Sequence, residues 1–370
     1  EIRLSLVGSE MCIRDRTAEE RYQTAAGVRQ DLQRCLAEWE GQGFIDGFPL
    51  GQQDTPNRLL ISEKLYGRER EIATLHAAFD RAFGSGAAEL VLVSGYSGIG
   101  KSSVVNELHK MLVAPRGLFA AGKFDQYNRD IPYATLAQAL HGLVRSLLGK
   151  SDAVLAPWRE ALREALGPNG QLMVDLVPAL GALIGPQPPV SELPPQEAQR
   201  RFQLVFRRML GVFARPERPL TLFLDDLQWL DIATLDLLEY LATQPESRNL
   251  LLVGAYRDNE VTATHPLTRR LTAIRSVGGR VQEIVLSPLQ LDDVEQLIAD
   301  ALRCGRELIA PLAQLVHEKA AGNPFFTIEF VAALAEEGLL AFDHAQGRWS
   351  WELERIQAKG YTENVVDLML

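Results

Sequence analysis

The chain of 370 residues carries a formal net charge of -10, and 46% of its residues are hydrophobic. This apolar fraction permits a large core and more than one domain, whereas the acidic balance argues against a general nucleic-acid-binding surface. No apolar run approaches the length of a membrane-spanning helix and no secretory signal is visible, so we expect a cytoplasmic protein without a membrane partner. Its three cysteines, Cys12, Cys35 and Cys304, lack metal-ligand spacing, which indicates thiols in a reducing compartment.

The N-terminal segment does not have the pattern of a domain start. Residues 1–16 end in MCIRDR, which resembles the translation of a transposon end used to prepare sequencing libraries. We therefore hypothesise that residues 1–16 are an artefact and leave them out of the fold argument. Apolar residues at helical spacing follow, with Thr17 as a possible N-cap, and a stretch rich in Gly and Pro then predicts a linker as far as residue 60.

A glycine-rich motif begins where the apolar run ELVLVSG, residues 89–95, ends. The run predicts a buried strand, and the residues after the motif have helical spacing. Gly95, Gly100, Lys101 and Ser102 fill the template G-x-x-x-x-G-K-[ST] of the P-loop. The alternative is a glycine-rich hairpin or linker, which the agreement of strand, loop, lysine, hydroxyl and helix disfavours.

This motif predicts a phosphate site, because glycines allow backbone N–H groups at a helix N-terminus to approach an anion closely. Lys101 would reach the β and γ phosphates, and the Ser102 hydroxyl would ligate Mg²⁺. ATP and Mg²⁺ are thus the expected cofactors. The residues of this loop that we expect to bind nucleotide are Gly95, Gly98, Ile99, Gly100, Lys101, Ser102 and Ser103.

Two adjacent carboxylates, Asp225 and Asp226, end the apolar run LFLDD. A buried ionised carboxylate is costly unless it is paired, so the structural alternative requires Arg, Lys or backbone N–H partners. With the glycine loop in the same chain, we expect Asp225 to hold Mg²⁺ opposite the Ser102 hydroxyl, directly or through water. We expect Asp226 to act in catalysis by polarising the water that attacks the γ phosphate.

Further strands and helices are predicted around these motifs. Residues 116–126 indicate another strand, and residues 133–148 form a strongly amphipathic helical pattern. Residues 249–261 contain a buried-strand pattern that ends in Arg257 and Asp258. Arg257, together with Lys101 and Asp226, is a candidate catalytic residue, because a cation at that strand end could sense the γ phosphate. The alternative is a surface arginine paired with Asp258.

These motifs resemble those of signal-transducing P-loop ATPases, of the AAA and STAND type, in large bacterial multidomain kinases. LYGREREI, residues 65–72, is similar to the segment that precedes the P-loop in that family, which implies that Gly67 and Arg68 help to position adenine. Residues 18–36 resemble the last helices of a serine/threonine kinase domain. Gly-Asn-Pro at residues 322–324 resembles the element by which the helical lid senses nucleotide, so the resemblance implies a nucleotide contact for Pro324. By itself, the tripeptide indicates a turn before a helix.

The predicted fold class is α/β, with the parallel sheet of a P-loop NTPase, helices on both faces, a helical lid and the start of a winged-helix module. Five segments are predicted: an artefact at residues 1–16, a kinase helix with linker at 17–60 and an ATPase core at 61–275. A helical lid at 276–340 and a truncated winged helix at 341–370 follow.

No kinase catalytic motif occurs in the chain, so we expect an ATPase and no kinase activity from these residues. The favoured function is a nucleotide-operated signalling switch that binds ATP and ADP and acts on other domains of the same chain, with a kinase upstream and sensor modules downstream. A nucleotide-dependent oligomer is a further expectation. Two alternatives stay open: an origin-recognition-like DNA-binding ATPase, although nucleic acid is not the expected partner, and a nucleotide-binding scaffold without turnover.

Overall fold

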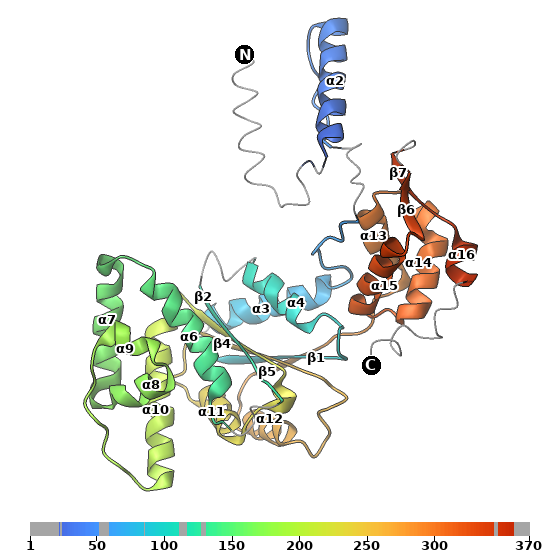
Figure 1. The fold of residues 1–370 in the computed structure, drawn as a ribbon. Helices are drawn as coiled ribbons and strands as arrows, with labels where there is room; N and C mark the ends of the chain where they lie inside the picture. Colours follow the sequence, from blue (N-terminus) through green and yellow to red (C-terminus); the bar gives the residue numbers. More distant parts are fainter. Residues whose placement is uncertain are drawn as a thin grey trace. The chain divides into compact units, whose positions relative to one another are not determined.

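A computed structural model describes residue 22 and residues 24–51, 59–84, 86–110, 117–126, 131–343 and 347–358 (Figure 1). The suspected artefact, the proposed cap Thr17 and the last twelve residues of the predicted winged helix lie outside these ranges. The chain divides into two compact units. We call Arg68–Ser287 the core unit and the two remaining segments, 1–67 and 288–370, the flanking unit. Each is considered by itself.

The core unit contains a five-stranded sheet in the order β2-β3-β4-β1-β5, and all its neighbouring strands run parallel. Its strands are β1 (Glu89–Ser94), β2 (Leu118–Lys123), β3 (Leu220–Asp225), β4 (Leu250–Tyr256) and β5 (Val281–Val285). The parallel α/β fold expected of a P-loop NTPase is confirmed. Because β1 and β3 are adjacent to β4 in this order, their carboxyl ends open at the same edge of the sheet.

Both faces of the sheet are covered by helices (Figure 1). Leu90 and Leu92 of β1 join a hydrophobic cluster supplied by α6 (Ala134–Leu148), α11 (Ile232–Thr243) and α12 (Pro266–Ser276). Val91 and Val93 alternate with them and are also fully buried, so they face the other side. On that side lie α3 (Glu69–Gly84), which contacts β1, and α4 (Lys101–Leu108). Burial on both faces explains why the central strands are continuously apolar.

A helical insertion separates β2 from β3. After α6 it comprises α7 (Asp152–Leu166), the short turn η3 (Gly167–Asn169), α8 (Gly170–Leu176), α9 (Ala179–Ile184) and α10 (Pro195–Phe213). Trp158 of α7 stacks on Phe213 of α10 with 5.4 Å between ring centroids, and the Arg218 guanidinium lies 4.3 Å from the Trp158 ring centroid. These contacts fix the insertion against the strand that leads to the aspartate pair.

The core unit differs from the predicted range of 61–275 at both ends. Its sheet includes β5, which pairs with β1, so the core continues to Ser287. At its start, the core begins at Arg68, because the preceding residues pack elsewhere. Tyr66 is buried in the flanking unit and its hydroxyl donates to Asp300 Oδ2 at 2.9 Å. The predicted lid boundary at residue 276 is therefore too early.

The flanking unit has its own hydrophobic cluster. Its elements after the core are α13 (Leu291–Leu302), α14 (Arg306–Ala320), α15 (Pro324–Glu336), an antiparallel hairpin of β6 (Leu340–Asp343) and β7 (Arg348–Trp351), and α16 (Leu353–Ala358). The helices fall where a lid was predicted, and the winged helix stays a prediction. Near the N-terminus, α2 (Ala25–Gln42) begins after Thr24, whose hydroxyl accepts the Gly27 N–H at 3.0 Å. In the described ranges, no helix combines the length and apolarity needed to cross a bilayer.

Candidate active site

The glycine loop joins β1 directly to α4. Gly95, Gly98 and Gly100 all have positive φ, at 146°, 76° and 97°, a region that residues with side chains rarely adopt. A Cβ at Gly95 would lie 2.9 Å from the Leu286 carbonyl oxygen, so glycine is also required there by space. No side chain caps α4 at Gly100. The loop thus leaves the N–H groups of the first helical turn available to an anion.

Lys101 begins α4 and bends back over the loop. Its Nζ donates to the carbonyl oxygens of Gly95 and Tyr96, both at 2.8 Å, and only 8% of the residue is exposed. Burial lowers the pKa of Lys101, and the negative charge of Asp225 partly opposes that effect. The Lys101 ammonium is therefore held by the glycine loop itself. The phosphates that it is predicted to contact would bind to the same loop.

The side chains of Ser102 and Asp225 meet although they are 123 positions apart in sequence. The Ser102 hydroxyl donates to Asp225 Oδ2 at 2.7 Å, and the Asp226 N–H donates to Asp225 Oδ1 at 2.9 Å. Asp225 is 8% exposed, and no cation of the described residues lies within ion-pair distance of it. A hydroxyl beside a buried carboxylate without a cation is a donor set that fits Mg²⁺, which prefers hard oxygen ligands.

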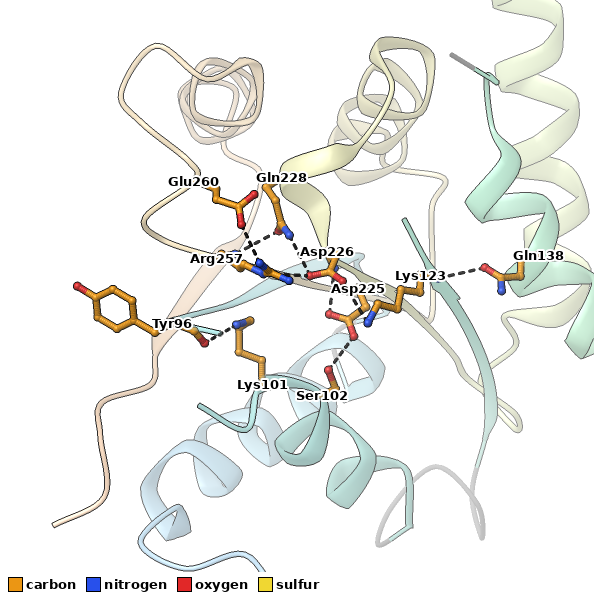
Figure 2. Close-up of polar contacts among 10 residues, drawn as sticks. All are labelled: Tyr96, Lys101, Ser102, Lys123, Gln138, Asp225, Asp226, Gln228, Arg257 and Glu260. Carbon is orange, nitrogen blue, oxygen red and sulfur yellow. Dashed lines mark hydrogen bonds and ion pairs between the residues drawn. The ribbon is translucent and has the colours of Figure 1, made fainter. Parts of the chain in front are cut away.

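The Asp226 carboxylate lies among the polar side chains of Lys123, Gln228 and Arg257 (Figure 2). Its Oδ1 accepts Gln228 Nε2 at 2.9 Å and lies 3.8 Å from Arg257 Nε, while its Oδ2 lies 3.2 Å from Lys123 Nζ. The residue is 6% exposed and has a φ of 58°, in the left-handed region. Cations of the kind required by the structural alternative are therefore present for Asp226, whereas Asp225 has, among the described residues, the Ser102 hydroxyl and one backbone N–H as its side-chain partners.

Arg257 lies beyond the end of β4 and is directed towards the aspartate pair (Figure 2). Its Nη1 pairs with Glu260 Oε1 at 3.0 Å, and its guanidinium lies 5.2 Å from the centroid of the Trp229 ring. The ion pairs of Arg257 are with Glu260 and Asp226 and not with Asp258, whose carboxylate accepts the N–H of Asn259. Arg257 is thus near Asp226, as a γ-phosphate sensor would require.

The Arg68 side chain donates hydrogen bonds to backbone carbonyl groups of the core unit. It is 4% exposed, and its Nη2 donates to the carbonyl oxygens of Ile99 at 3.2 Å and Ser287 at 2.7 Å. Arg68 therefore holds the glycine loop through the carbonyl oxygen of Ile99. Gly67 belongs to the flanking unit, where its φ is 61° and a Cβ would overlap the Asp293 carboxylate. A contact of these two residues with adenine remains a prediction.

The remaining predicted residues occupy different environments. Ile99 is 1% exposed and packs inside the loop, whereas Ser103 is exposed on α4. Pro324 is the first residue of α15 in the flanking unit, after Asn323, whose side chain accepts the Phe325 N–H at 3.1 Å. The turn-before-helix alternative therefore describes the local structure of this tripeptide. A contact of Pro324 with nucleotide remains a prediction.

Three site residues were missed in the sequence, namely Lys123, Gln228 and Glu260. Lys123 ends β2 and is in register with Asp225 on β3, so the strand pairing brings its ammonium to the acidic pair. The position of Lys123 near the aspartate pair could have been predicted only if the pairing of β2 with β3 had been known. Gln228 and Glu260 follow the predicted residues at short distances in sequence, and their proximity was the available signal.

Comparison with known proteins places these motifs in a family. The family model described as "AAA ATPase domain" matches residues 64–253. Hybrid signal transduction histidine kinase G of Dictyostelium discoideum is 28% identical over 96% of this chain, which spans only 12% of that protein. The crystal structure of Cdc6p from Pyrobaculum aerophilum is 12% identical with a TM-score of 0.44, over 75% of this chain and 65% of that one.

A further structural neighbour is the Signal Transduction ATPase with Numerous Domains (STAND) protein with a tetratricopeptide repeat sensor from Pyrococcus horikoshii. It is 15% identical with a TM-score of 0.35, over 74% of this chain and 30% of that one. The region matched by the family model contains both the glycine loop and the aspartate pair and makes up just over half of the sequence. The chain therefore belongs to the AAA ATPase domain family.

Proposed function

We propose that the core unit binds ATP with Mg²⁺ at the carboxyl edge of its sheet and hydrolyses it. The observation that carries the proposal is the 2.7 Å contact between the Ser102 hydroxyl and the Asp225 carboxylate. It brings the end of the glycine loop and the end of β3 together at one point. The buried carboxylate of Asp225, which has no ion-pair partner among the described residues, supports the same conclusion, because such a charge is costly unless a ligand compensates it.

Each residue has a distinct task in this proposal. The N–H groups of the first turn of α4 bind the phosphates, and the Lys101 ammonium leaves the Gly95 and Tyr96 carbonyls to contact the β and γ phosphates. Ser102 and Asp225 would hold Mg²⁺, which neutralises charge on the phosphate oxygens.

Asp226 prepares the water for its reaction. The carboxylate orients the water and accepts its proton, while the water oxygen bonds to the γ phosphorus and the bond from that phosphorus to the ADP oxygen breaks. Arg257 lies on the same edge, 3.8 Å from Asp226, where its positive charge can stabilise the phosphoryl group during transfer.

Phosphate release and ATP affinity, measured on the same variants, test the proposal. Asp226→Asn should lose turnover by about 100-fold or more while its ATP affinity stays within a few-fold of the wild-type value. Asp258→Asn is a matched control, because this exposed carboxylate accepts the Asn259 N–H and takes no part in the hydrogen bonds and ion pairs described for Asp226. Retention of wild-type phosphate release by Asp226→Asn would refute the catalytic role of this carboxylate. Absence of phosphate release from a wild-type protein that binds ATP would favour the nucleotide-binding scaffold without turnover. Wild-type ATP affinity in Lys101→Ala would contradict the site itself.

The biological context that we propose is a regulatory module in a multidomain signalling kinase. The name of the Dictyostelium relative supports a histidine kinase context, and this chain spans a small part of that protein. The serine/threonine kinase tail inferred for residues 17–60 stays a prediction, as do a bacterial origin, a nucleotide-dependent oligomer and sensor modules downstream. Nucleotide-dependent autophosphorylation of the complete protein, abolished by Lys101→Ala, tests the regulatory role.

A further inference from the structure

Gln228 uses both ends of its side-chain amide at the centre of the site (Figure 2). Its Nε2 donates to Asp226 Oδ1 at 2.9 Å, and its Oε1 accepts the backbone N–H of Arg257 at 3.2 Å. The residue is 5% exposed, so neither hydrogen bond competes freely with water. One amide therefore joins the carboxylate that follows β3 to the backbone that follows β4.

The short turn that carries Gln228 is itself held against β4. Gln228 lies in η4 (Leu227–Trp229), and the preceding Leu227 packs over Gly254, where an added Cβ would overlap the leucine side chain. The Gln228 carbonyl oxygen lies 3.3 Å from His265 Nε2 at the start of α12. These contacts fix the turn on both sides of Gln228, so the position of its amide is set by the packing around it.

The two oxygens of Asp226 consequently differ. Oδ1 accepts the buried amide at 2.9 Å and lies 3.8 Å from Arg257 Nε, whereas Oδ2 lies 3.2 Å from Lys123 Nζ, on a side chain that is 66% exposed. An ion pair with so exposed a lysine contributes little and exchanges readily with water. The terminal torsion of a carboxylate is broad, so without the amide the Asp226 plane can rotate. Oδ2 is thus the oxygen on the side of the exposed lysine, and the hydrogen bond from the amide to Oδ1 constrains where it points.

We propose that Gln228 is a positioning residue for the ATP hydrolysis described above. It holds Oδ1 of Asp226 so that Oδ2 is presented to the attacking water, and the hydrogen bond that it accepts from the Arg257 N–H anchors the amide in that position. This inference rests on the proposed ATPase function, and it assigns Gln228 no contact with nucleotide. Loss of the amide should therefore change the rate of hydrolysis and leave ATP binding intact.

Gln228→Met tests the role, because methionine has a similar length and cannot replace either hydrogen bond. We expect kcat for phosphate release to fall by about 10- to 100-fold, with ATP affinity within twofold of wild type. Gln199→Met is a matched control, since that amide donates at 3.2 Å to Asp236 on an exposed surface, and its kcat should stay within twofold. Gln228→Glu, which retains the acceptor for Arg257 and cannot donate when ionised, should repeat the loss if the methionine variant does not fold.

A double-mutant cycle distinguishes positioning from a general structural effect. In an Asp226→Asn background, Gln228→Met should change the residual rate by less than about twofold, because the carboxylate that it positions is gone. Wild-type kcat in Gln228→Met, or an equal loss in both backgrounds, overturns the proposed role and leaves the ATPase function standing. Absence of phosphate release from the wild-type protein, or its retention in Asp226→Asn, overturns the proposed catalytic function and this inference together.

Discussion

Replacing Lys101 by methionine should separate nucleotide binding from fold stability. Lys101 is 8% exposed, and its ammonium donates to the carbonyl oxygens of Gly95 and Tyr96, both at 2.8 Å. Burial lowers its pKa, which means that the folded loop disfavours the charged form. Methionine has a similar length and no charge. The substitution therefore removes two hydrogen bonds and, at the same time, the cost of burying the ammonium.

The expected magnitudes follow from these opposing contributions. A hydrogen bond from a charged group contributes about 1.5–3 kcal/mol, and burying an ion costs several kcal/mol, so the two changes largely cancel. Without nucleotide, we expect the free energy of unfolding of Lys101→Met to lie within about 1 kcal/mol of the wild-type value. ATP at 100 times its Kd should stabilise the wild-type protein by about 2.7 kcal/mol. For a unit of this size that corresponds to a rise in Tm of roughly 5–11 °C.

Thermal unfolding with and without ATP and Mg²⁺ measures both effects. The wild-type protein and Lys150→Met, which alters an exposed lysine after α6, should show the full nucleotide-dependent rise in Tm. Lys101→Met should show none and should unfold near the ligand-free wild-type temperature. A full rise in Lys101→Met would refute the assignment of this lysine to the phosphates. A loss of more than about 3 kcal/mol in the ligand-free variant would refute the argument that its charge is costly to bury.

Three further substitutions test the geometry of the site. Asp226→Ala should be about 1 kcal/mol less stable to urea than Asp226→Asn, because asparagine tolerates the φ of 58° and alanine does not; equal stabilities would contradict this reason. Ser102→Ala should raise the Mg²⁺ concentration for half-maximal phosphate release by about tenfold or more, and an unchanged requirement would exclude the hydroxyl as a ligand. Gly254→Ala should lower the free energy of unfolding by about 1–3 kcal/mol and slow phosphate release, because its methyl group displaces Leu227. Calorimetry together with a turnover assay checks the last expectation, and unchanged turnover would mean that the turn beneath Asp226 tolerates displacement.

Much of the sheet and the two phosphate-site motifs could be predicted from sequence, because their signals are local. A strand buried on both faces is a continuous apolar run, and the glycine loop must place several residue types at fixed spacing. The prediction that Ser102 and Asp225 share one site agrees with their 2.7 Å contact. That agreement depended on the parallel fold, which makes the carboxyl ends of central strands converge.

The features that were missed depend on neighbours that are distant in sequence. β5 is an edge strand with a partly exposed pattern and a glutamate at its centre, so its apolar signal is weak and the core boundary was placed too early. Lys123 gains its position only through the pairing of β2 with β3. Gln228 resembles any polar residue in a turn until the burial of both ends of its amide is known.

The chain passes between the two units twice, at Gly67/Arg68 and at Ser287/Pro288, and this arrangement has a consequence for the order of folding. The core is one uninterrupted stretch, so it can form during synthesis as soon as its last strand has emerged. The Arg68 hydrogen bond to Ser287 then holds its two ends together. In the flanking unit, Tyr66 contacts Asp300, and the whole core unit lies between these two residues in the sequence. Once the core has folded, the chain that this contact must close is effectively much shorter. Variants that slow assembly of the sheet should therefore delay burial of Tyr66 as well, even though that tyrosine belongs to the other unit.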